Sequence, residues 1–380
     1  MDNATAIKPR KLRRRGRTSQ VRIYLGKLLR GFVYQSDWKV FPMAALIAAL
    51  FSMVGRNNFF TSMEGTLTGS FGLACIGIWN GCFNSIQVIC RERAIIKREH
   101  RSGMHISSYI FAHMLYQGLL CAGQTALTLF VCYKLGMHFP VAGLVTPFFM
   151  VDIAVTMFLL TYAADMLSLL ISALVHSTTV AMTVMPFLLI FQLVFSGGFF
   201  QLPQWTEGLK TAALSNFGLR AICAQTDYNG LPTIAGWRLL EKATGLEVKG
   251  EVSPQEIIDA VRKNPTEPVR AFLEKPLAEG LTLKDLLDQT DNAALVSPEL
   301  REMLDVKIPY EFTVGDVIEA VGRENVETII KVRAAAAMQN TRYEHERSNV
   351  LMCWLFLVFY ALLYAFVATV ALEFIDKDKR

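Results

Sequence analysis

Residues Val350–Phe374 read VLMCWLFLVFYALLYAFVATVALEF, and they follow a long polar stretch. The only charged residue in this run is Glu373, at its end. A helix needs roughly 20 apolar residues to cross the hydrocarbon core of a bilayer. Bare lipid cannot satisfy an open backbone, so a run of this length predicts a membrane-spanning helix.

Five more apolar blocks precede this run in a chain of 380 residues, 52 % of them hydrophobic, with a mean hydropathy of +0.33. They are Val40–Val54, Leu67–Cys90, Tyr109–Tyr133, Val141–Ala163 and Val180–Phe200. Six blocks of about bilayer length in one chain argue against the core helices of a soluble protein. The sequence therefore predicts an all-α integral membrane protein with six transmembrane helices.

The distribution of Lys and Arg predicts the orientation of these helices. The first 39 residues hold eleven Lys/Arg and two acids, and Arg91–Arg101 holds five Lys/Arg. The loops after the first and third blocks hold one basic residue each, Arg56 and Lys134. Because cytoplasmic loops carry the excess of positive charge, we expect a multi-pass protein of the cell membrane with both termini in the cytoplasm.

This topology divides the chain into four expected parts. They are a basic cytoplasmic tail with a surface helix at 1–39, the first five transmembrane helices with a cytoplasmic hairpin at 91–107 within 40–203, an extracytoplasmic domain at 204–348, and the sixth transmembrane helix with a short cytoplasmic tail at 349–380. The domain at 204–348 holds 17 Lys/Arg against 23 Asp/Glu. A capping box at Ser253–Glu256 and weaker signals at Thr282–Asp285 and Thr313–Asp316 predict that it is mainly helical.

The N-terminal part predicts contact with membrane lipid. Val21, Leu25, Leu28 and Phe32 share one helical face, which is typical of an amphipathic helix lying along a membrane surface. The basic run at residues 8–17 is a pattern also found in nucleic-acid-binding proteins. Ahead of a transmembrane block it is more simply a tail that meets anionic head groups, so we expect no nucleic-acid partner.

The sequence contains no pattern that predicts catalysis. It has no phosphate loop, no His-Glu-x-x-His and no Gly-x-Ser-x-Gly, and its six histidines are scattered. Six of the seven cysteines lie in or at the ends of apolar blocks, without a Cys-x-x-Cys pair. We therefore expect no enzyme, no catalytic residue, no metal site and no cofactor bound by this chain itself.

Several polar residues fall inside the apolar blocks, where they are costly in lipid. Asn80 and Asn84 are four apart on one helical face beside Phe83, and Gln192 lies in the fifth block. They line a transport pathway or form hydrogen bonds between helices, and the sequence does not separate these alternatives. Asp152 and Asp165 are thirteen apart, and we favour roles at a helix end or in the bundle interior over a proton relay.

The segment between the second and third blocks has a regular charge pattern. Arg91 and Arg98 are seven apart, as are Glu92 and Glu99, so each pair shares a helical face. Residues 94–96 supply an apolar side, and Ser102-Gly103 interrupts the pattern. The sequence therefore predicts a short amphipathic cytoplasmic hairpin.

This segment also resembles a known family. RERAIIKREHRSGMHISSYIFA is similar to a segment of ABC-2 type permeases, in particular the G-subfamily (white/pleiotropic drug resistance type) membrane domain. The similar positions are Glu92, Arg93, Arg98, Glu99, Gly103, Met104, Ser108 and Tyr109. LVFSGGFFQLPQW at 193–205 resembles the family's turn after its fifth helix, and residues 215–230 resemble the stretch that follows.

The resemblance implies a membrane-spanning permease that exports a hydrophobic or lipid-like compound as a dimer. Few residues precede the surface helix, so a separate ABC ATPase subunit would bind ATP and Mg²⁺. The implied coupling residues are Arg91, Glu92, Arg93, Arg98, Glu99 and Gly103. The implied pathway residues are Asn80, Phe83, Asn84 and Gln192, and the implied outer-gate turn is Ser196, Gly197 and Gly198. The alternative is a membrane receptor or scaffold that displays residues 231–345 outside the cell.

Overall fold

The computed structural model describes residues 16–34, 37–55, 59–198, 207–231 and 339–374. Within these residues the chain is helical, and extended pairing is limited to one isolated bridge between Ala142 and Phe148. The chain divides into one unit of Met1–Leu231 with Asn340–Arg380 and a second of Pro232–Gln339. The helices expected to begin at the capping signals at 253–256, 282–285 and 313–316 lie outside the described residues.

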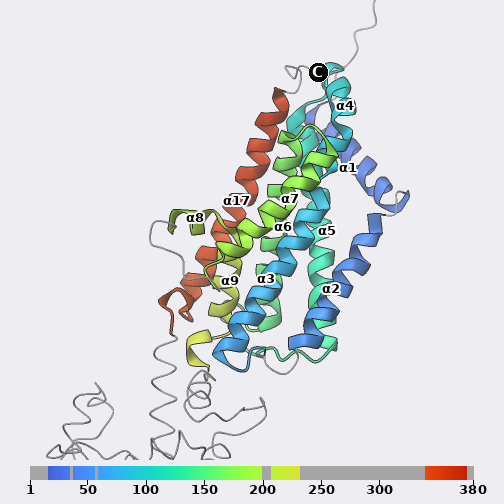
Figure 1. The fold of residues 1–380 in the computed structure, drawn as a ribbon. Helices are drawn as coiled ribbons and strands as arrows, with labels where there is room; N and C mark the ends of the chain where they lie inside the picture. The colour runs from blue at the N-terminus through green and yellow to red at the C-terminus, as the bar shows by residue number, and fades with distance from the viewer. Residues whose placement is uncertain (1–15, 35–36, 56–58, 199–206, 232–338, 375–380) are drawn as a thin grey trace, which may run out of the picture. The chain divides into compact units, whose positions relative to one another are not determined.

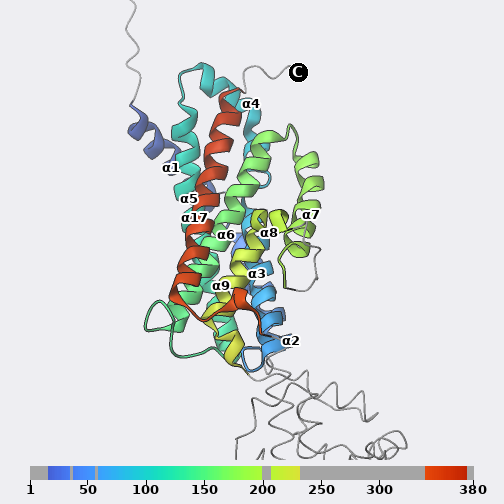
Figure 2. The same cartoon turned by 90° about the vertical axis from the view of Figure 1, so that its left-hand side faces the viewer.

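Four stretches of the first unit are long and apolar enough to cross a membrane. They are α3 and α4 taken together (Met63–Ser85 and Val88–Arg101), α5 (Ile106–Lys134), α6 (Phe149–Leu174) and α17 (Arg347–Glu373). Figures 1 and 2 show them running along the length of this unit. The described part of the chain is thus an all-α bundle typical of a membrane protein.

Two further apolar helices, α2 (Val40–Gly55) and α7 (Thr178–Val194), correspond to the first and fifth expected spans. With 16 and 17 residues they rise only about 24–26 Å, which is less than the roughly 30 Å of hydrocarbon. Ser177 begins α7, and its hydroxyl accepts a hydrogen bond from the backbone N–H of Val180 at 3.3 Å. Six crossings therefore need α2 and α7 to be completed by flanking residues or by local thinning of the bilayer.

The helix of the fourth expected span has different bounds from the ones we predicted. The block Val141–Ala163 gives way to α6, which begins eight residues later and continues to Leu174. Asp152 explains the late start, because its carboxylate accepts hydrogen bonds from the backbone N–H groups of residues 144, 145 and 146 at 2.8–2.9 Å. These bonds stabilise a turn where helix was expected, and they give Asp152 a role at the helix end.

The second expected span also ends earlier than predicted. The block ran to Cys90, but α3 ends at Ser85 and α4 begins at Val88. A turn at residues 86–87 separates the two helices, so Ile89 and Cys90 belong to the amphipathic segment. Both of these side chains are buried, and they anchor α4 to the bundle.

Helix α9 (Leu214–Gln225) packs within the bundle, although it falls inside the stretch 204–348 that we expected to form a separate domain. Eleven of its twelve residues are buried, and it packs against α3, α6 and α17. Apolar side chains of these helices, such as Leu160, Phe217 and Leu357, form one core. By contacts, α9 belongs to the first unit, and the second unit spans Pro232–Gln339. The extracytoplasmic domain expected at 204–348 stays a prediction.

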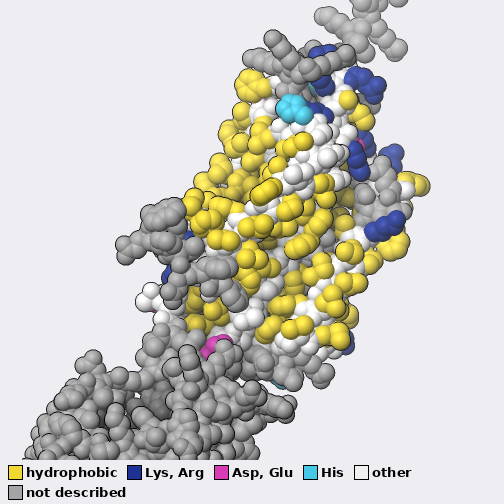
Figure 3. Space-filling view, viewed as in Figure 1, with side chains coloured by type: hydrophobic (Ala, Val, Ile, Leu, Met, Phe, Trp, Pro, Cys, Tyr) yellow, Lys and Arg dark blue, Asp and Glu magenta, His cyan; other side chains and the backbone are white. Residues whose placement is uncertain are grey.

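The surface of the first unit separates apolar from basic side chains. Hydrophobic side chains cover most of the face shown in Figure 3, and Lys and Arg gather toward the end that carries α1 (Arg17–Tyr34) and α4. The last turn of α17 lies at this same end (Figures 1 and 2). An apolar band beside a basic end is the pattern expected of a bundle that sits in a bilayer.

Candidate coupling helix and intramembrane polar sites

The start of α4 is fixed to the end of α6 by one serine. The backbone N–H groups of Ile89 and Cys90 donate to the hydroxyl oxygen of Ser172 at 3.0 and 3.1 Å. The first N–H groups of any helix lack partners within the helix, and here a neighbouring helix supplies the acceptor. The first turn of α4 is therefore hydrogen-bonded directly to the last turn of α6.

Arg93 makes a second connection between the same two helices. Its guanidinium donates to the carbonyl oxygens of Ala173 at 2.8 Å and Val175 at 3.3 Å. These carbonyls belong to the C-terminal end of α6, where the helix dipole favours a positive charge. Arg93 thus faces inward and stabilises the end of α6.

The two acids of α4 face the surface helix α1. Glu92 forms an ion pair with Lys27 at 3.5 Å, and the carboxylate of Glu99 accepts a hydrogen bond from the phenol of Tyr24 at 2.8 Å. Burial raises the pKa of Tyr24, and the bond to Glu99 raises it further, so the phenol remains a donor. The matched spacing of the acids thus serves contact within this chain.

The turn after α4 is also held by α1. Gly103 has a φ of 101°, a conformation that glycine adopts without strain. The side-chain amide of Gln20 donates to the carbonyl of Gly103 at 3.3 Å and accepts from the N–H of His105 at 2.9 Å. The hairpin predicted at 91–107 is therefore α4, this turn and the start of α5.

The remaining face of α4 is exposed. Its exposed residues are Arg91, Ala94, Ile95, Arg98, Arg101 and Ser102. Of the six residues predicted for coupling, only Arg91 and Arg98 lie on this face, while Glu92, Arg93 and Glu99 contact neighbouring helices. The sequence analysis did not identify Gln20, Tyr24, Lys27 or Ser172, although the helical periodicity of α1 was a signal that it packs against a partner.

The predicted pathway residues lie at two separate places in the bundle, one between α3 and α5 and the other between α7 and α9. The side-chain amides of Asn84 in α3 and Gln124 in α5 donate to each other's oxygens at 2.8 and 3.1 Å. Phe83 stacks on Trp79 and is exposed, and Asn80 is buried. Gln192 instead faces α9, where its side-chain oxygen accepts from the backbone N–H of Ser215 at 3.1 Å.

The predicted gate turn follows directly after α7. Ser196 is buried, and its hydroxyl donates to the carbonyl of Leu193 at 2.9 Å. Gly197 has a φ of 76°, and Gly198 lies against Leu219 of α9. The turn therefore rests on α9, and residues 199–203 of the same sequence segment lie outside the described residues.

Asp165 lies in the interior of the bundle. It is fully buried in α6, and the thiol of Cys121 in α5 donates to one carboxyl oxygen at 3.3 Å. Asp152 lies thirteen residues earlier, in the first turn of α6, where it holds the preceding turn. The two acids thus occupy a bundle interior and a helix end, as the sequence analysis favoured.

Comparison with known protein families shows which family the chain belongs to. Residues 30–217, from the last turn of α1 into α9, match the membrane domain of the ABC-2 type transporters. The chain belongs to the ABC-2 type transporter family. An ABC-2 membrane domain is the permease component of an ABC transporter, which favours this function over the receptor or scaffold alternative. No curated protein matches this ABC-2 permease.

Proposed function

We propose that this ABC-2 permease is energised by a separate ABC ATPase subunit, which binds the exposed face of α4. The observation that carries the proposal is the attachment of α4 to two other helices. Ser172 and Arg93 join α4 to α6, and Tyr24 and Gln20 join α1 to the segment that runs from α4 into α5. A force applied to the exposed face would move these helices together.

The same proposal assigns the direction and environment of the chain. The basic end with α1, α4 and the end of α17 would face the cytoplasm, and residues 231–345 would lie outside the cell membrane. The α2 and α7 segments would complete six crossings. The positive-inside bias of the sequence supports this orientation.

We further propose export of a hydrophobic or lipid-like compound between two permease copies, either identical or related. Asn80, Phe83 and Asn84 would line the pathway from α3, and the turn at Ser196, Gly197 and Gly198 would form the outer gate. Gln192 would act indirectly, by holding α7 against α9. The resemblance of the α4 sequence to G-subfamily permeases supports this assignment.

The test of the ATPase contact uses substitutions that leave the bonds within the chain intact. Ile95 is 40 % exposed and Arg98 is exposed on the same face of α4. Ile95→Ser with Arg98→Glu should abolish co-purification of the ATPase and its stimulated ATP hydrolysis. Arg22→Glu, a charge reversal on the exposed side of α1, is the control and should retain both.

The proposal fails if the double variant binds and stimulates the ATPase as wild type does. An engineered cysteine within 251–330 tests the orientation separately. Labelling of that cysteine by an impermeant maleimide from the cytoplasmic side alone would contradict the proposed topology.

A further inference from the structure

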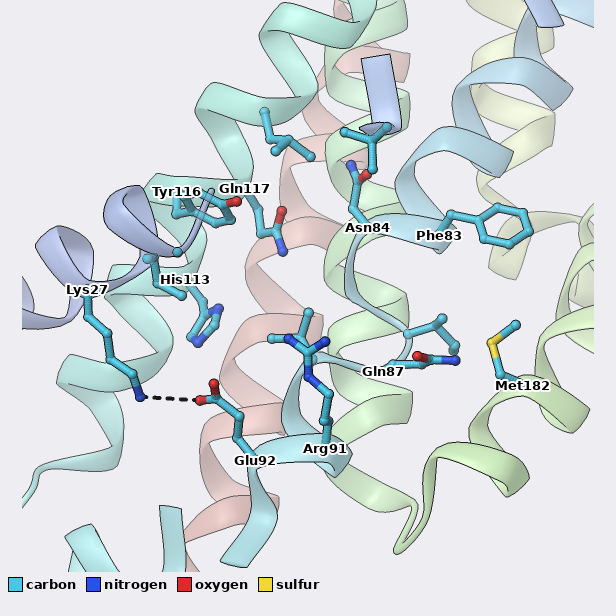
Figure 4. Close-up of a pocket in the computed structure, with 16 residues that line it drawn as sticks. Lys27, Phe83, Asn84, Gln87, Arg91, Glu92, His113, Tyr116, Gln117 and Met182 are labelled. Carbon is cyan, nitrogen blue, oxygen red and sulfur yellow. Dashed lines mark hydrogen bonds and ion pairs between the residues drawn. The ribbon is translucent and has the colours of Figure 1, made fainter. Parts of the chain in front are cut away.

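A cavity of about 310 Å³ opens where the surface helix α1 meets α3, α4, α5 and α7 (Figure 4). It lies at the basic end of the bundle, next to the exposed face of α4. Its lining combines two cations, one acid, three side-chain amides, one imidazole and several apolar side chains. This combination is unusual for a cavity beside membrane-spanning helices, where charged groups are costly.

Two cations and one acid set the charge of the cavity. Lys27 and Arg91 line it together with Glu92, which leaves one net positive charge. Glu92 pairs with Lys27 at 3.5 Å. Among the described residues, none forms a hydrogen bond or ion pair with the guanidinium of Arg91, which Figure 4 shows reaching into the space between Glu92 and Gln117. Arg91 is therefore positioned to receive an anionic group.

Two buried side chains in the lining carry polar atoms that have no hydrogen-bond partner among the described residues. His113 is 1 % exposed, and neither of its ring nitrogens has a partner among the described residues. Gln117 is 2 % exposed; its amide nitrogen donates to Ser85 at 2.8 Å, but its oxygen has no partner in the described part of the chain. A buried polar atom without a hydrogen-bond partner lowers the stability of the fold. Its presence beside a cavity therefore indicates a bound group that forms the missing hydrogen bond.

The side of the cavity toward α7 is apolar and open. Phe83 and Met182 line it while remaining 47 % and 39 % exposed, and Leu28 of α1 and Leu120 of α5 add apolar surface to the rest of the lining. An alkyl chain placed there would be removed from water, which favours binding in proportion to the apolar area that it buries. The polar and apolar parts of the lining thus match the two parts of an amphiphile.

We propose that this cavity binds an anionic amphiphile, with its phosphate or carboxylate between Arg91 and His113 and its alkyl chain along Phe83 and Met182. Lys27 adds positive charge, and Gln117 accepts a hydrogen bond from a hydroxyl of the head group. This inference rests on the proposed export function, because it names the chemical class of compound that approaches the pathway from the basic end of the bundle. It adds a site for an anionic head group to the pathway proposed for hydrophobic or lipid-like compounds.

The test measures ligand binding to the purified permease in a non-ionic maltoside detergent. Dodecyl phosphate should bind at least about tenfold more tightly than dodecylphosphocholine, which has the same chain and a compensated charge. Inorganic phosphate alone should bind much more weakly than dodecyl phosphate, because it makes no contact with the apolar side. Binding of dodecylphosphocholine and dodecyl phosphate with equal affinity would overturn the proposal, and so would displacement of dodecyl phosphate by equimolar inorganic phosphate.

Variants separate a binding role from a structural one. Arg91→Gln and His113→Phe should each weaken dodecyl phosphate binding by about tenfold. His113→Phe should also raise the melting temperature of the ligand-free protein, since it removes two unpartnered buried nitrogens. Arg22→Gln removes an equal charge from α1 outside the cavity and should bind as wild type. Equal loss of binding in Arg22→Gln and Arg91→Gln would show a general charge effect and contradict the site.

These measurements need no ATPase, so they are independent of the test of the proposed function. If ATPase co-purification succeeds and dodecyl phosphate does not bind, the permease assignment stands and the cavity assignment fails. If dodecyl phosphate binds through Arg91 and His113 but no ATPase co-purifies, the site stands and the coupling proposal fails.

Discussion

The phenol of Tyr24 donates a hydrogen bond of 2.8 Å to the carboxylate of Glu99, and this bond joins the surface helix α1 to the end of α4. The two residues are 75 positions apart in the sequence. The ring of Tyr24 also meets the ring of Tyr109 edge-on, with 5.6 Å between centroids. Tyr24 therefore contacts α4 and α5 at once, and α1 is part of the unit that would respond to an ATPase.

Tyr24→Phe tests this connection by removing the hydroxyl and keeping the ring. Hydrogen bonds to charged groups contribute about 1.5–3 kcal/mol, and partial exposure lowers the expected loss here to about 1 kcal/mol. Amide hydrogen exchange in α1 should become faster, and ATPase stimulation should fall. Tyr34→Phe, at the exposed end of the same helix, should change neither. Unchanged exchange in Tyr24→Phe would show that α1 is held by other contacts.

The sequence predicted α1 well because its apolar and charged residues follow a helical period. Val21, Leu25 and Leu28 are half-buried, as the pattern indicated, and Arg22 is exposed. It did not predict that Tyr24 and Gln20 bind the α4 hairpin. Those contacts join segments more than 70 residues apart, and no local pattern encodes such a pairing.

The register of α6 was missed for a different reason. Hydropathy alone does not distinguish a helix from an apolar turn, and residues 141–148 are apolar enough for either. The turn depends on three hydrogen bonds to the carboxylate of Asp152. That acid was noticed as a polar residue within an apolar block, and its preference for accepting backbone N–H groups at a helix start was the signal for the shift.

Arg93 and Arg98 should behave differently although they lie on the same helix. Arg93→Gln removes the charge at the C-terminal end of α6 and should lower stability by about 0.5–1 kcal/mol. Arg98→Gln should leave the melting temperature unchanged and weaken ATPase binding. The measurement is thermal unfolding in detergent beside ATPase pull-down for both variants. Loss of stability in Arg98→Gln alone would reverse the assignment of inward and outward faces.

The pair of Asn84 and Gln124 tests whether the amides of α3 serve packing or transport. A double-mutant cycle with Asn84→Leu and Gln124→Leu should give a coupling free energy between about 0.6 and about 1.7 kcal/mol, the average and the maximum for hydrogen bonds between membrane helices. If the pair is structural, each variant should lose stability and the double variant should recover part of it. Near-zero coupling together with changed substrate selectivity would instead favour a pathway role for Asn84.

Gly81 tests how closely α3 approaches α6. A Cβ built at this position would lie 2.2 Å from the backbone carbonyl oxygen of Thr161, which cannot move without shifting α6. Gly81→Ala should therefore force the helices apart and cost about 1–3 kcal/mol. The control is Gly118→Ala in α5, where the nearest atom is a ring carbon of Tyr162 at 3.7 Å and the contact is ordinary. Thermal unfolding should separate the two variants by several degrees. Equal melting temperatures would mean that α3 and α6 can move apart at little cost, which would contradict the close packing of Gly81 against the backbone of Thr161.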